Sequence, residues 1–313
     1  MNTVDRLKRA FKNPQLFARG LNRAYYRRGG LRSENTAGID VFDQDWDTLV
    51  ILDACRYDLF EQVNHIEGKL ATKHSKASAT SEWLQANIDG RDLLDTVYVT
   101  ANPQLERNRE RWDVNFHEII NVWLDQGWDK ETGTVLADTM TQTAIETYDQ
   151  FPNKRLVVHY MQPHYPFVSA NTDFDKKHLV SIEDSNDSAV GENIWNQIFI
   201  GELDLSRKEL WELYATNLEY VLTHVNDLLS IVPGKTVITS DHGNYVGERA
   251  FPIPVREYGH PRGLYGDAVI QVPWLEHTRG ERREIVTGAD KSQSPDIESE
   301  TVKNRLRNLG YVE

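Results

Sequence analysis

Asp241 and His242 place a carboxylate and an imidazole side by side, directly after a short apolar run at 236–239. Val237 and Ile238 in this run are β-branched residues typical of a buried strand, and the glycine after the histidine indicates a turn. Sheets of parallel strands place their active sites at the carboxyl ends of the strands. A carboxylate next to an imidazole suits a divalent cation. The alternative is that Asp241 caps a turn and His242 is a buried polar residue without a chemical role.

A second carboxylate follows another apolar run. Residues 48–52 predict a fully buried parallel strand, and Asp53 comes directly after it. If both strands are parallel, Asp53 and Asp241 lie at the same edge of the sheet. The alternative for Asp53 is the N-cap of a helix that begins near Ala54. Arg56 carries a guanidinium that can bind an anionic substrate through two hydrogen bonds.

Small hydroxyl residues, including Ser78, Thr80 and Ser81, stand just before a helical pattern. Ordinary helix capping accounts for most such runs. The catalytic alternative is a hydroxyl nucleophile at a helix N-terminus. There a metal lowers the pKa of the hydroxyl, and the helix dipole favours an incoming oxyanion.

Two histidines lie in loops that proline and glycine make rigid. His164 lies between two prolines, just past a third predicted strand at 156–161, and His260 lies between a glycine and a proline. A single histidine is more often structural than catalytic. Two in rigid loops favour a functional role, because loops on a rigid scaffold carry many binding residues.

The order of these features resembles that of the alkaline phosphatase and sulfatase superfamily, from about Thr48 to Pro273. An Asp after the first strand is followed by a Ser/Thr-rich helix start, a Pro-His-Tyr-Pro loop, a Ser-Asp-His-Gly motif and a late histidine. The segment from His260 to Leu275 resembles sulfatase-like proteins of salt-loving archaea. The resemblance implies an alkaline-phosphatase-like fold.

The resemblance also implies one bound divalent metal ion, with manganese, zinc, magnesium and calcium all open. It implies that the ion is held by Asp53, Thr80, Asp241 and His242. Thr80 would also be the nucleophile. His164 and His260 would bind the substrate anion, and one of them would protonate the leaving oxygen. Arg56 is a further candidate for contact with the substrate.

Three departures from the superfamily pattern restrict the chemistry that we expect. Cys55 is the only cysteine and does not lie in the Cys/Ser-x-Pro-x-Arg motif of sulfatases, so formylglycine chemistry is not expected. Asp53 stands alone where sulfatases have paired acids. The chain has no clear Asp-x-x-x-His sequence between the nucleophile and the Asp-His-Gly motif, which favours one metal over two. Because Ser78 and Ser81 lie close to Thr80, all three remain candidate nucleophiles.

The body of the chain alternates predicted strands and helices. This pattern implies an α/β fold with a mainly parallel central sheet and helices on both faces. A fourth predicted strand, at 97–100, ends at Asn102. The predicted helices cover about Glu118–Gln126, Val135–Tyr148 and Lys208–Ser230.

Charge and composition divide the chain into three parts. Residues 1–32 form a basic amphipathic arm, 33–278 the catalytic domain, and 279–313 a polar loop with a C-terminal helix at about 300–309. The arm carries nine Lys/Arg and one acid, a net charge of +8. The remaining residues hold 26 bases and 47 acids, a net charge of −21, which argues against a nucleic-acid partner.

The arm has two interpretations that remain open. A basic amphipathic helix at residues 4–28, interrupted at Pro14, can lie on an anionic membrane surface. Alternatively, it packs on the acidic body or binds a partner. No apolar run approaches the roughly 20 residues of a membrane span, and no secretory signal is present. We therefore expect a cytoplasmic protein, peripheral to the membrane if the arm binds lipid.

The sequence predicts a metal-dependent hydrolase or transferase that acts on a phosphate-type ester through a Thr or Ser nucleophile. One alternative is a sulfate ester hydrolase with an unmodified hydroxyl. The other is a non-catalytic binder of an anionic glycan or lipid headgroup. In each case the expected partner is an anionic small molecule, glycan or lipid headgroup.

Overall fold

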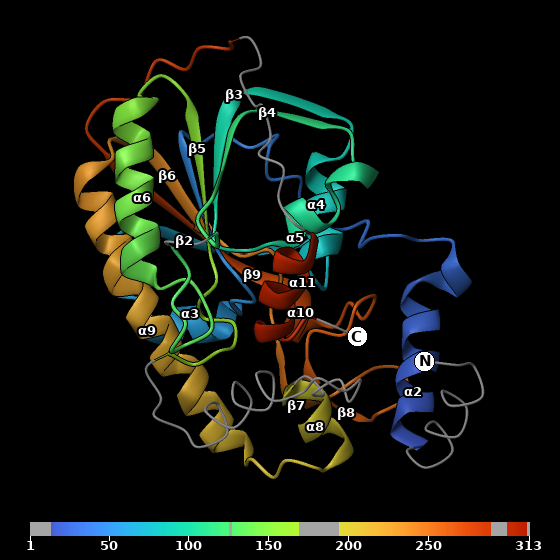
Figure 1. Cartoon of the computed structure of the whole chain (residues 1–313). Helices are drawn as coiled ribbons and strands as arrows, with labels where there is room; N and C mark the ends of the chain where they lie inside the picture. Colours follow the sequence, from blue (N-terminus) through green and yellow to red (C-terminus); the bar gives the residue numbers. More distant parts are fainter. Residues whose placement is uncertain (1–13, 125–126, 169–193, 289–298, 312–313) are drawn as a thin grey trace.

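A computed structural model of the 313-residue chain describes residues 14–124, 127–168, 194–288 and 299–311 (Figure 1). Its centre is a seven-stranded sheet in the order β2-β9-β6-β1-β5-β3-β4. The strands are β1 (Thr48–Leu52), β2 (Lys69–His74), β3 (Arg91–Thr100), β4 (Val114–Asn121), β5 (Arg155–Tyr160), β6 (Gly234–Thr239) and β9 (Gln271–Arg279). Every neighbouring pair is parallel except the two that β9 forms. The predicted α/β fold with a mainly parallel sheet is confirmed.

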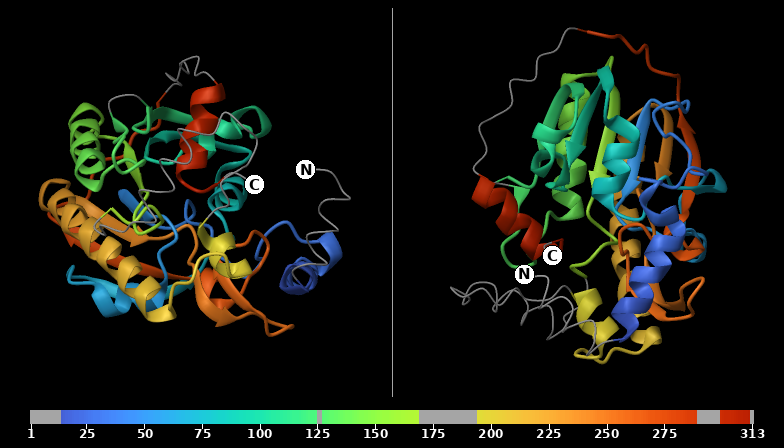
Figure 2. Two further views of the ribbon diagram at one scale, coloured as in Figure 1. Left: turned by 60° about the horizontal axis from the view of Figure 1, so that its bottom comes forward. Right: turned by 90° about the vertical axis from the view of Figure 1, so that its right-hand side faces the viewer.

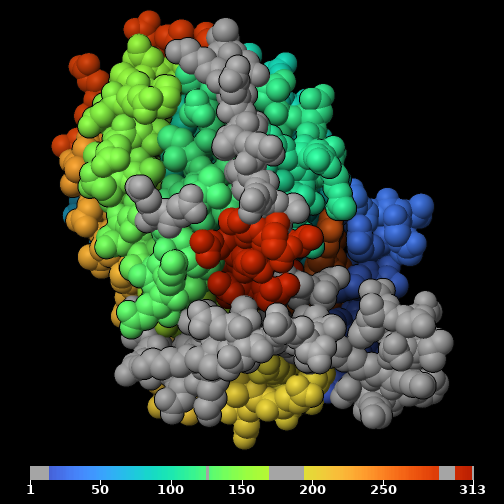
Figure 3. Space-filling view, viewed as in Figure 1, coloured from blue at the N-terminus to red at the C-terminus, as the bar shows by residue number. Residues whose placement is uncertain are grey.

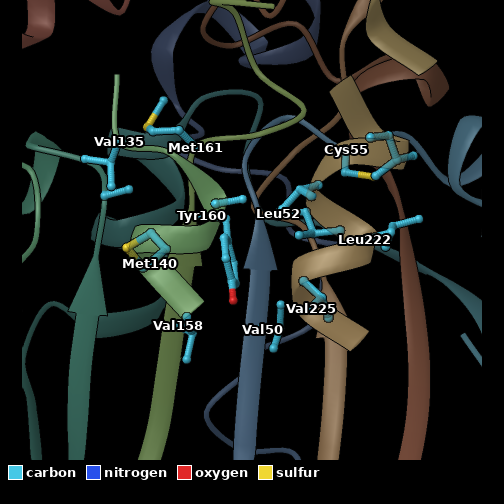
Figure 4. Packing of buried hydrophobic residues seen from close by; sticks show 14 of the residues in the cluster. Val50, Leu52, Cys55, Val135, Met140, Val158, Tyr160, Met161, Leu222 and Val225 are labelled. Carbon is cyan, nitrogen blue, oxygen red and sulfur yellow. The ribbon is translucent and has the colours of Figure 1, made fainter. Parts of the chain in front are cut away.

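One face of the sheet is covered by two long helices, α6 (Ala137–Gln150) and α9 (Arg207–Ile231). Val50 of β1 turns to this face and belongs to the same buried cluster as Met140 of α6 and Leu222 of α9, as Figure 4 shows. The apolar stripe of α9 recurs at helical spacing because that side of the helix lies on the sheet.

The opposite face is covered by α4 (Thr80–Ile88). Leu49 and Ile51 of β1 point to this side and share a second buried cluster with Trp83 and Leu84 of α4. Alternate residues of one strand therefore lie in separate cores. This double burial explains why β1 is a continuous apolar run, and it confirms the prediction of helices on both faces.

Shorter elements surround the sheet. They are α2 (Pro14–Tyr26), η1 (Arg28–Gly30), α3 (Tyr57–Val63), α5 (Gln104–Arg107), η2 (Arg109–Arg111), α8 (Ile194–Ile200), β7 (Tyr245–Arg249), β8 (Arg256–Gly259), α10 (Asp267–Ile270) and α11 (Ser299–Asn308). Strands β7 and β8 form a separate antiparallel pair. Helix α2 lies at the periphery, away from the central sheet (Figures 1 and 2), and α11 lies on the surface seen in Figure 3. No helix of the described chain is long and apolar enough to cross a membrane.

The structure describes part of the N-terminal arm and part of the C-terminal segment. The helix expected at 4–28 is present as α2 from Pro14 onward, and residues 1–13 lie outside the described chain. The expected C-terminal helix is present as α11. Within the polar loop, 280–288 contain neither helix nor strand, and 289–298 lie outside the described residues.

The helix predicted at about 118–126 is wrong. Residues 118–121 belong to strand β4, which runs parallel to residues 97–100 of β3. The local pattern around Ile119 and Ile120 does not separate helix from strand, and pairing with β3 decides it. Strands β2 and β9 were also missed. Strand β2 is a half-exposed edge strand whose polar sequence has no strong strand signal.

Asn217 of α9 holds the loop that carries His164. Its side-chain amide donates hydrogen bonds to the backbone carbonyls of Pro163 (3.1 Å), His164 (3.0 Å) and Pro166 (3.2 Å). Its carbonyl oxygen accepts from the backbone amide of Val168 (3.1 Å). A single buried side chain on a core helix thus fixes the position of the loop.

We expect Asn217→Ala to lower the free energy of unfolding by about 1–3 kcal/mol, because buried backbone groups would lose their hydrogen-bond partner. Urea denaturation measures this change. Thr216→Ala is the matched control, since the exposed Thr216 hydroxyl bonds only to the Glu212 carbonyl of the same helix. Equal losses in the two variants would contradict the role given to Asn217.

Candidate metal centre and active site

The carboxyl ends of four neighbouring strands bring polar side chains together. Asp53 directly follows β1, Asn102 lies two residues past β3, and Asp241 lies two residues past β6. His159 is the next-to-last residue of β5 and is paired in register with Ile51 of β1. Because these strands are parallel, all four side chains lie at the same edge of the sheet.

Asp53 Oδ1, Asp241 Oδ2 and His159 Nε2 are buried and have no hydrogen-bond partner among the described residues. Ligand atoms of these residues all lie within 4.8 Å of one another. Buried polar atoms are otherwise almost always satisfied. Two carboxylates and an imidazole are a donor set that zinc and manganese accept. The residues present therefore fit a divalent metal ion.

In each of these three side chains, the second oxygen or nitrogen atom is hydrogen-bonded to a neighbouring group. Asp53 Oδ2 accepts a hydrogen bond from the Asn102 side chain (2.7 Å), and Asp241 Oδ1 accepts from the backbone amide of Ala54 (3.0 Å). His159 Nδ1 is hydrogen-bonded to the hydroxyl of Tyr98 (2.7 Å). These bonds orient each side chain so that its unpartnered atom faces the others, as neighbours of metal ligands commonly do.

The electrostatics of Asp53 and Asp241 also favour a bound cation. Burial and the nearby charge of Asp241 raise the pKa of Asp53 well above its usual value. Burial acts against ionisation of Asp241 as well, but His242, His159 and the Ala54 amide outweigh it and lower its pKa. Burial lowers the pKa of His159 to about 4, which keeps it in the neutral form that binds metals. Two buried carboxylates this close cannot both be ionised without a neighbouring positive charge.

His242 lies beside the same cluster. Its Nδ1 donates to the carbonyl of Gly243 (2.8 Å), and its Nε2 lies toward the two carboxylates. That Nε2 is 3.3 Å from Asp241 Oδ2 and 3.8 Å from Asp53 Oδ1. The structure thus brings Asp53, Asp241 and His242 together and adds His159. Their role as ligands stays a prediction that the geometry supports.

Thr80 is the first residue of α4 and is fully buried. Its Oγ1 lies 3.4 Å from Asp53 Oδ2 and 3.3 Å from His242 Nε2. The residue before it, Ala79, makes no side-chain cap. The Thr80 hydroxyl therefore faces the carboxylate cluster at the N-terminus of a helix.

The other candidate nucleophiles are placed differently. Ser78 Oγ is 3.0 Å from Glu82 Oε2 and accepts from the backbone amide of Gly263 (2.7 Å). Ser81 follows Thr80 on the helix and is half-buried. Of the three hydroxyls, Thr80 is the one whose hydrogen-bond contacts include Asp53.

His164 and His260 lie next to this cluster. Their Nε2 atoms are 3.0 Å apart, and the His260 ring stacks on His242 with centroids 4.4 Å apart. His164 Nδ1 bonds to the carbonyl of Tyr165. Burial lowers the pKa of both rings, to about 4 for His164. Two neutral imidazoles from distant loops therefore meet next to His242, whose Nε2 contacts the Thr80 hydroxyl.

Arg56 is occupied by protein groups. Its guanidinium donates to Asp58 Oδ1 (2.8 Å), Glu248 Oε1 (2.7 Å) and the carbonyl of Asn244 (3.0 Å). These contacts hold the loop after β6 against the start of α3. A contact of Arg56 with substrate stays a prediction, and the ion pairs already account for its burial.

Sequence reasoning missed three residues of the site: Asn102, His159 and Tyr311. Asn102 had a usable signal, because it follows a predicted strand as Asp53 does. His159 had a weaker one, since it lies near the end of a predicted parallel strand. Tyr311 had none. Its hydroxyl donates to Asp53 Oδ2 (2.8 Å), accepts from Asn102 (3.1 Å) and lies 3.3 Å from Thr80 Oγ1.

The Tyr311 ring also contributes to the site, because it stacks on His164 with centroids 5.0 Å apart. Burial and the charge of Asp53 raise the pKa of Tyr311, so its hydroxyl stays protonated and can donate. The segment after α11 therefore completes the hydrogen bonding of Asp53 and leaves the other oxygen of that carboxylate unpartnered.

Comparison with known proteins finds no matching family model and no curated protein of similar sequence. Several solved structures are similar. The C-terminal periplasmic domain of EcEptC from Escherichia coli, in complex with zinc, is 14% identical, with 76% of this chain and 75% of that chain covered and a TM-score of 0.43. The soluble domain of lipooligosaccharide phosphoethanolamine transferase A from Neisseria meningitidis is 12% identical, with 73% and 75% covered and a TM-score of 0.45.

A protein in the alkaline phosphatase superfamily from Vibrio parahaemolyticus is 10% identical, with 80% of this chain and 63% of that chain covered and a TM-score of 0.40. The structural neighbours thus include members of the superfamily that the sequence resembles. At TM-scores below 0.5 this likeness assigns neither a family nor a reaction to the chain. The resemblance to archaeal sulfatase-like proteins stays a prediction.

We expect metal affinity to increase with pH. Asp53 has a raised pKa and holds a proton in the metal-free site, so binding must release that proton. Below the pKa of Asp53, affinity should fall by up to about tenfold for each unit of pH. Calorimetric titration with zinc or manganese in two buffers of different protonation enthalpy measures the release.

Asp53→Asn should abolish the proton release, whereas Asp227→Asn, an exposed control on α9, should not. Binding without proton release by the unchanged protein would contradict the assignment.

We expect Tyr311→Phe to weaken metal binding by about tenfold or more, because Asp53 would lose a donor that fixes its orientation. The aromatic ring that stacks on His164 is retained. Calorimetry and the metal-induced rise in melting temperature measure the effect. Tyr220→Phe is the matched control, since this half-buried hydroxyl accepts from the Ala137 amide away from the site. Equal affinities in both variants would show that Tyr311 does not position Asp53.

Proposed function

We propose that this protein is a metal-dependent enzyme that cleaves or transfers a phosphate-type ester, with Thr80 as the nucleophile. The observation that carries the proposal is the set of three unpartnered buried atoms, on Asp53, His159 and Asp241, next to a buried hydroxyl. A purely structural polar cluster would be expected to satisfy its own atoms. This cluster leaves unsatisfied the atoms that a cation would bind.

The residues that would hold the metal are Asp53, His159, Asp241 and His242. The mixture of carboxylate and imidazole fits zinc or manganese better than magnesium or calcium, which prefer oxygen ligands. When bound, the metal supplies positive charge that lowers the pKa of a nearby hydroxyl and offsets charge on the reacting phosphate group. Thr80 lies close enough to Asp53 to benefit from that charge.

Thr80 would attack the phosphorus atom through Oγ1. A new bond forms between Oγ1 and phosphorus, and the bond from phosphorus to the ester oxygen breaks. The hydroxyl proton has an acceptor in Asp53 Oδ2, 3.4 Å away. The N-terminal end of α4 favours the negative charge of the phosphate oxygens. Water or an acceptor alcohol would then release the phosphoryl group from Thr80.

We infer that the His164–His260 pair would supply a proton to the leaving oxygen. Nδ1 of His164 faces the Tyr165 carbonyl and carries the proton, so its Nε2 accepts. Nε2 of His260 must then be the donor across the 3.0 Å contact. An anionic substrate that separates the two rings would accept a hydrogen bond from this N–H. Its negative charge would raise the pKa of the His260 ring, which would take a proton from solvent at Nδ1 and pass its Nε2 proton to the ester oxygen, so that the oxygen leaves as an alcohol.

We expect Thr80→Ala to reduce turnover on the order of 10³-fold or more, while metal affinity stays within a few-fold of the unchanged protein. The nucleophile is lost, but the metal ligands remain. A panel of an aryl phosphate, a phosphodiester and an aryl sulfate, assayed with added zinc or manganese, measures turnover and separates phosphate from sulfate esters. Calorimetry measures metal binding.

Ser81→Ala is the matched control for this experiment, because Ser81 lies on the same helical turn, and it should retain activity. His159→Ala should lose metal binding, whereas His224→Ala, on the surface of α9, should keep it. Full activity of Thr80→Ala would remove Thr80 from the mechanism. A folded protein that binds no metal and gains no activity with zinc or manganese would favour a non-catalytic binder of an anionic glycan or lipid headgroup.

A further inference from the structure

The buried side chains of helix α2 are polar, whereas three of its large apolar side chains are exposed. Its buried residues are Arg19 and Asn22, whereas Phe17 is 64% exposed, Leu21 43% and Tyr25 54%. A helix that packs on a globular body normally does the reverse. The apolar face of α2 is therefore not explained by packing against the rest of the domain.

Polar contacts fix α2 to the body in this orientation. Arg19 forms an ion pair with the fully buried carboxylate of Glu257 at 2.6 Å. The Asn22 side chain donates to the carbonyl of Ile253 and accepts from its amide, each at 2.8 Å. These contacts tie the helix to β8 and to the turn between β7 and β8, so its outward face is set by specific bonds.

The turn between β7 and β8 extends the exposed apolar face of α2. Phe251 in this turn is 58% exposed, and its ring lies edge-on to Tyr25 with centroids 5.4 Å apart. Arg249 and Arg256 flank the turn and are exposed. We call this surface the α2–hairpin face: Phe17, Leu21, Tyr25, Arg28, Arg249, Phe251 and Arg256.

The charge of these segments is opposite to that of the whole chain. Residues 14–32 and 249–256 contain seven arginines and no Asp or Glu, in a chain with a formal net charge of −13. Arg28, the first residue of η1, is exposed. The α2–hairpin face therefore combines an apolar patch with positive charge, and its own segments supply no acid to neutralise that charge.

We propose that the α2–hairpin face docks on the surface of an anionic lipid bilayer. Phe17, Leu21, Tyr25 and Phe251 would enter the boundary between headgroups and acyl chains, and the exposed arginines would contact the anionic headgroups. A stripe of aromatic and leucine side chains bordered by arginine is typical of interfacial segments. The acidic remainder of the chain is repelled by the same surface, which favours approach through this face. The proposal uses none of the residues of the candidate active site.

Vesicle flotation with the full chain tests this proposal. We expect binding to phosphatidylcholine vesicles that contain phosphatidylglycerol, and much weaker binding to phosphatidylcholine alone or at high salt. Changing Arg28, Arg249 and Arg256 to Gln should weaken binding roughly fivefold for each arginine. Changing Phe17, Leu21 and Phe251 to Ser should reduce binding at least about tenfold. All of these side chains are exposed, and thermal unfolding verifies that the variants fold.

The matched control changes Ile231 and Val286 to Ser, because these residues are 45% and 46% exposed but lie outside the α2–hairpin face. This control should bind vesicles as the unchanged protein does. Absence of binding to anionic vesicles would overturn the proposal, and so would equal binding by the α2–hairpin variants. A dimer that depends on Phe17 and Phe251, detected by light scattering without vesicle binding, would assign the face to a second copy of the chain instead.

Discussion

The repulsion between two buried carboxylates, on Asp53 and Asp241, is the constraint on which the candidate site depends. Each side chain has one oxygen held by a hydrogen bond and one oxygen left without a partner. In a buried setting, such a pair is tolerated when one carboxyl keeps its proton or when a cation lies between them. The neutral imidazole of His159 completes the donor set. The repulsion between the two carboxylates, which makes the metal-free site unfavourable, would favour metal binding. A bound metal would in turn lower the pKa of the Thr80 hydroxyl.

The scaffold places these groups by two different means. Parallel register brings Asp53, His159 and Asp241 to one edge, because β1 pairs with both β5 and β6. Loops and the C-terminal segment supply the rest. Asn217 holds the loop of His164 through backbone carbonyls, and Tyr311 closes the hydrogen bonding around Asp53. The site is therefore assembled from most of the length of the chain, although its core lies on three adjacent strands.

Much of this architecture could be predicted from local sequence. The apolar runs that became β1, β5 and β6 are buried on both faces, and such strands need no partner information to be recognised. A polar residue directly after such a run, as at Asp53, predicts the edge of the sheet at which polar side chains meet. The helix predicted at about 118–126 overlaps the end of strand β4, because the apolar residues there fit either period and pairing with β3 decides between helix and strand.

The sequence by itself predicted the α/β class and the meeting of Asp53 with Asp241 and His242 at one edge of the sheet, whereas Thr80 was joined to them by the superfamily resemblance. The first two features follow from hydrophobic periodicity and from the direction of parallel strands, which are local properties of the chain. Tertiary structure decided that His159 joins the carboxylates, that Tyr311 reaches Asp53 from 258 positions away, and that α2 exposes its apolar side. These outcomes depend on contacts between distant segments, and no local pattern in the chain encodes which segments meet.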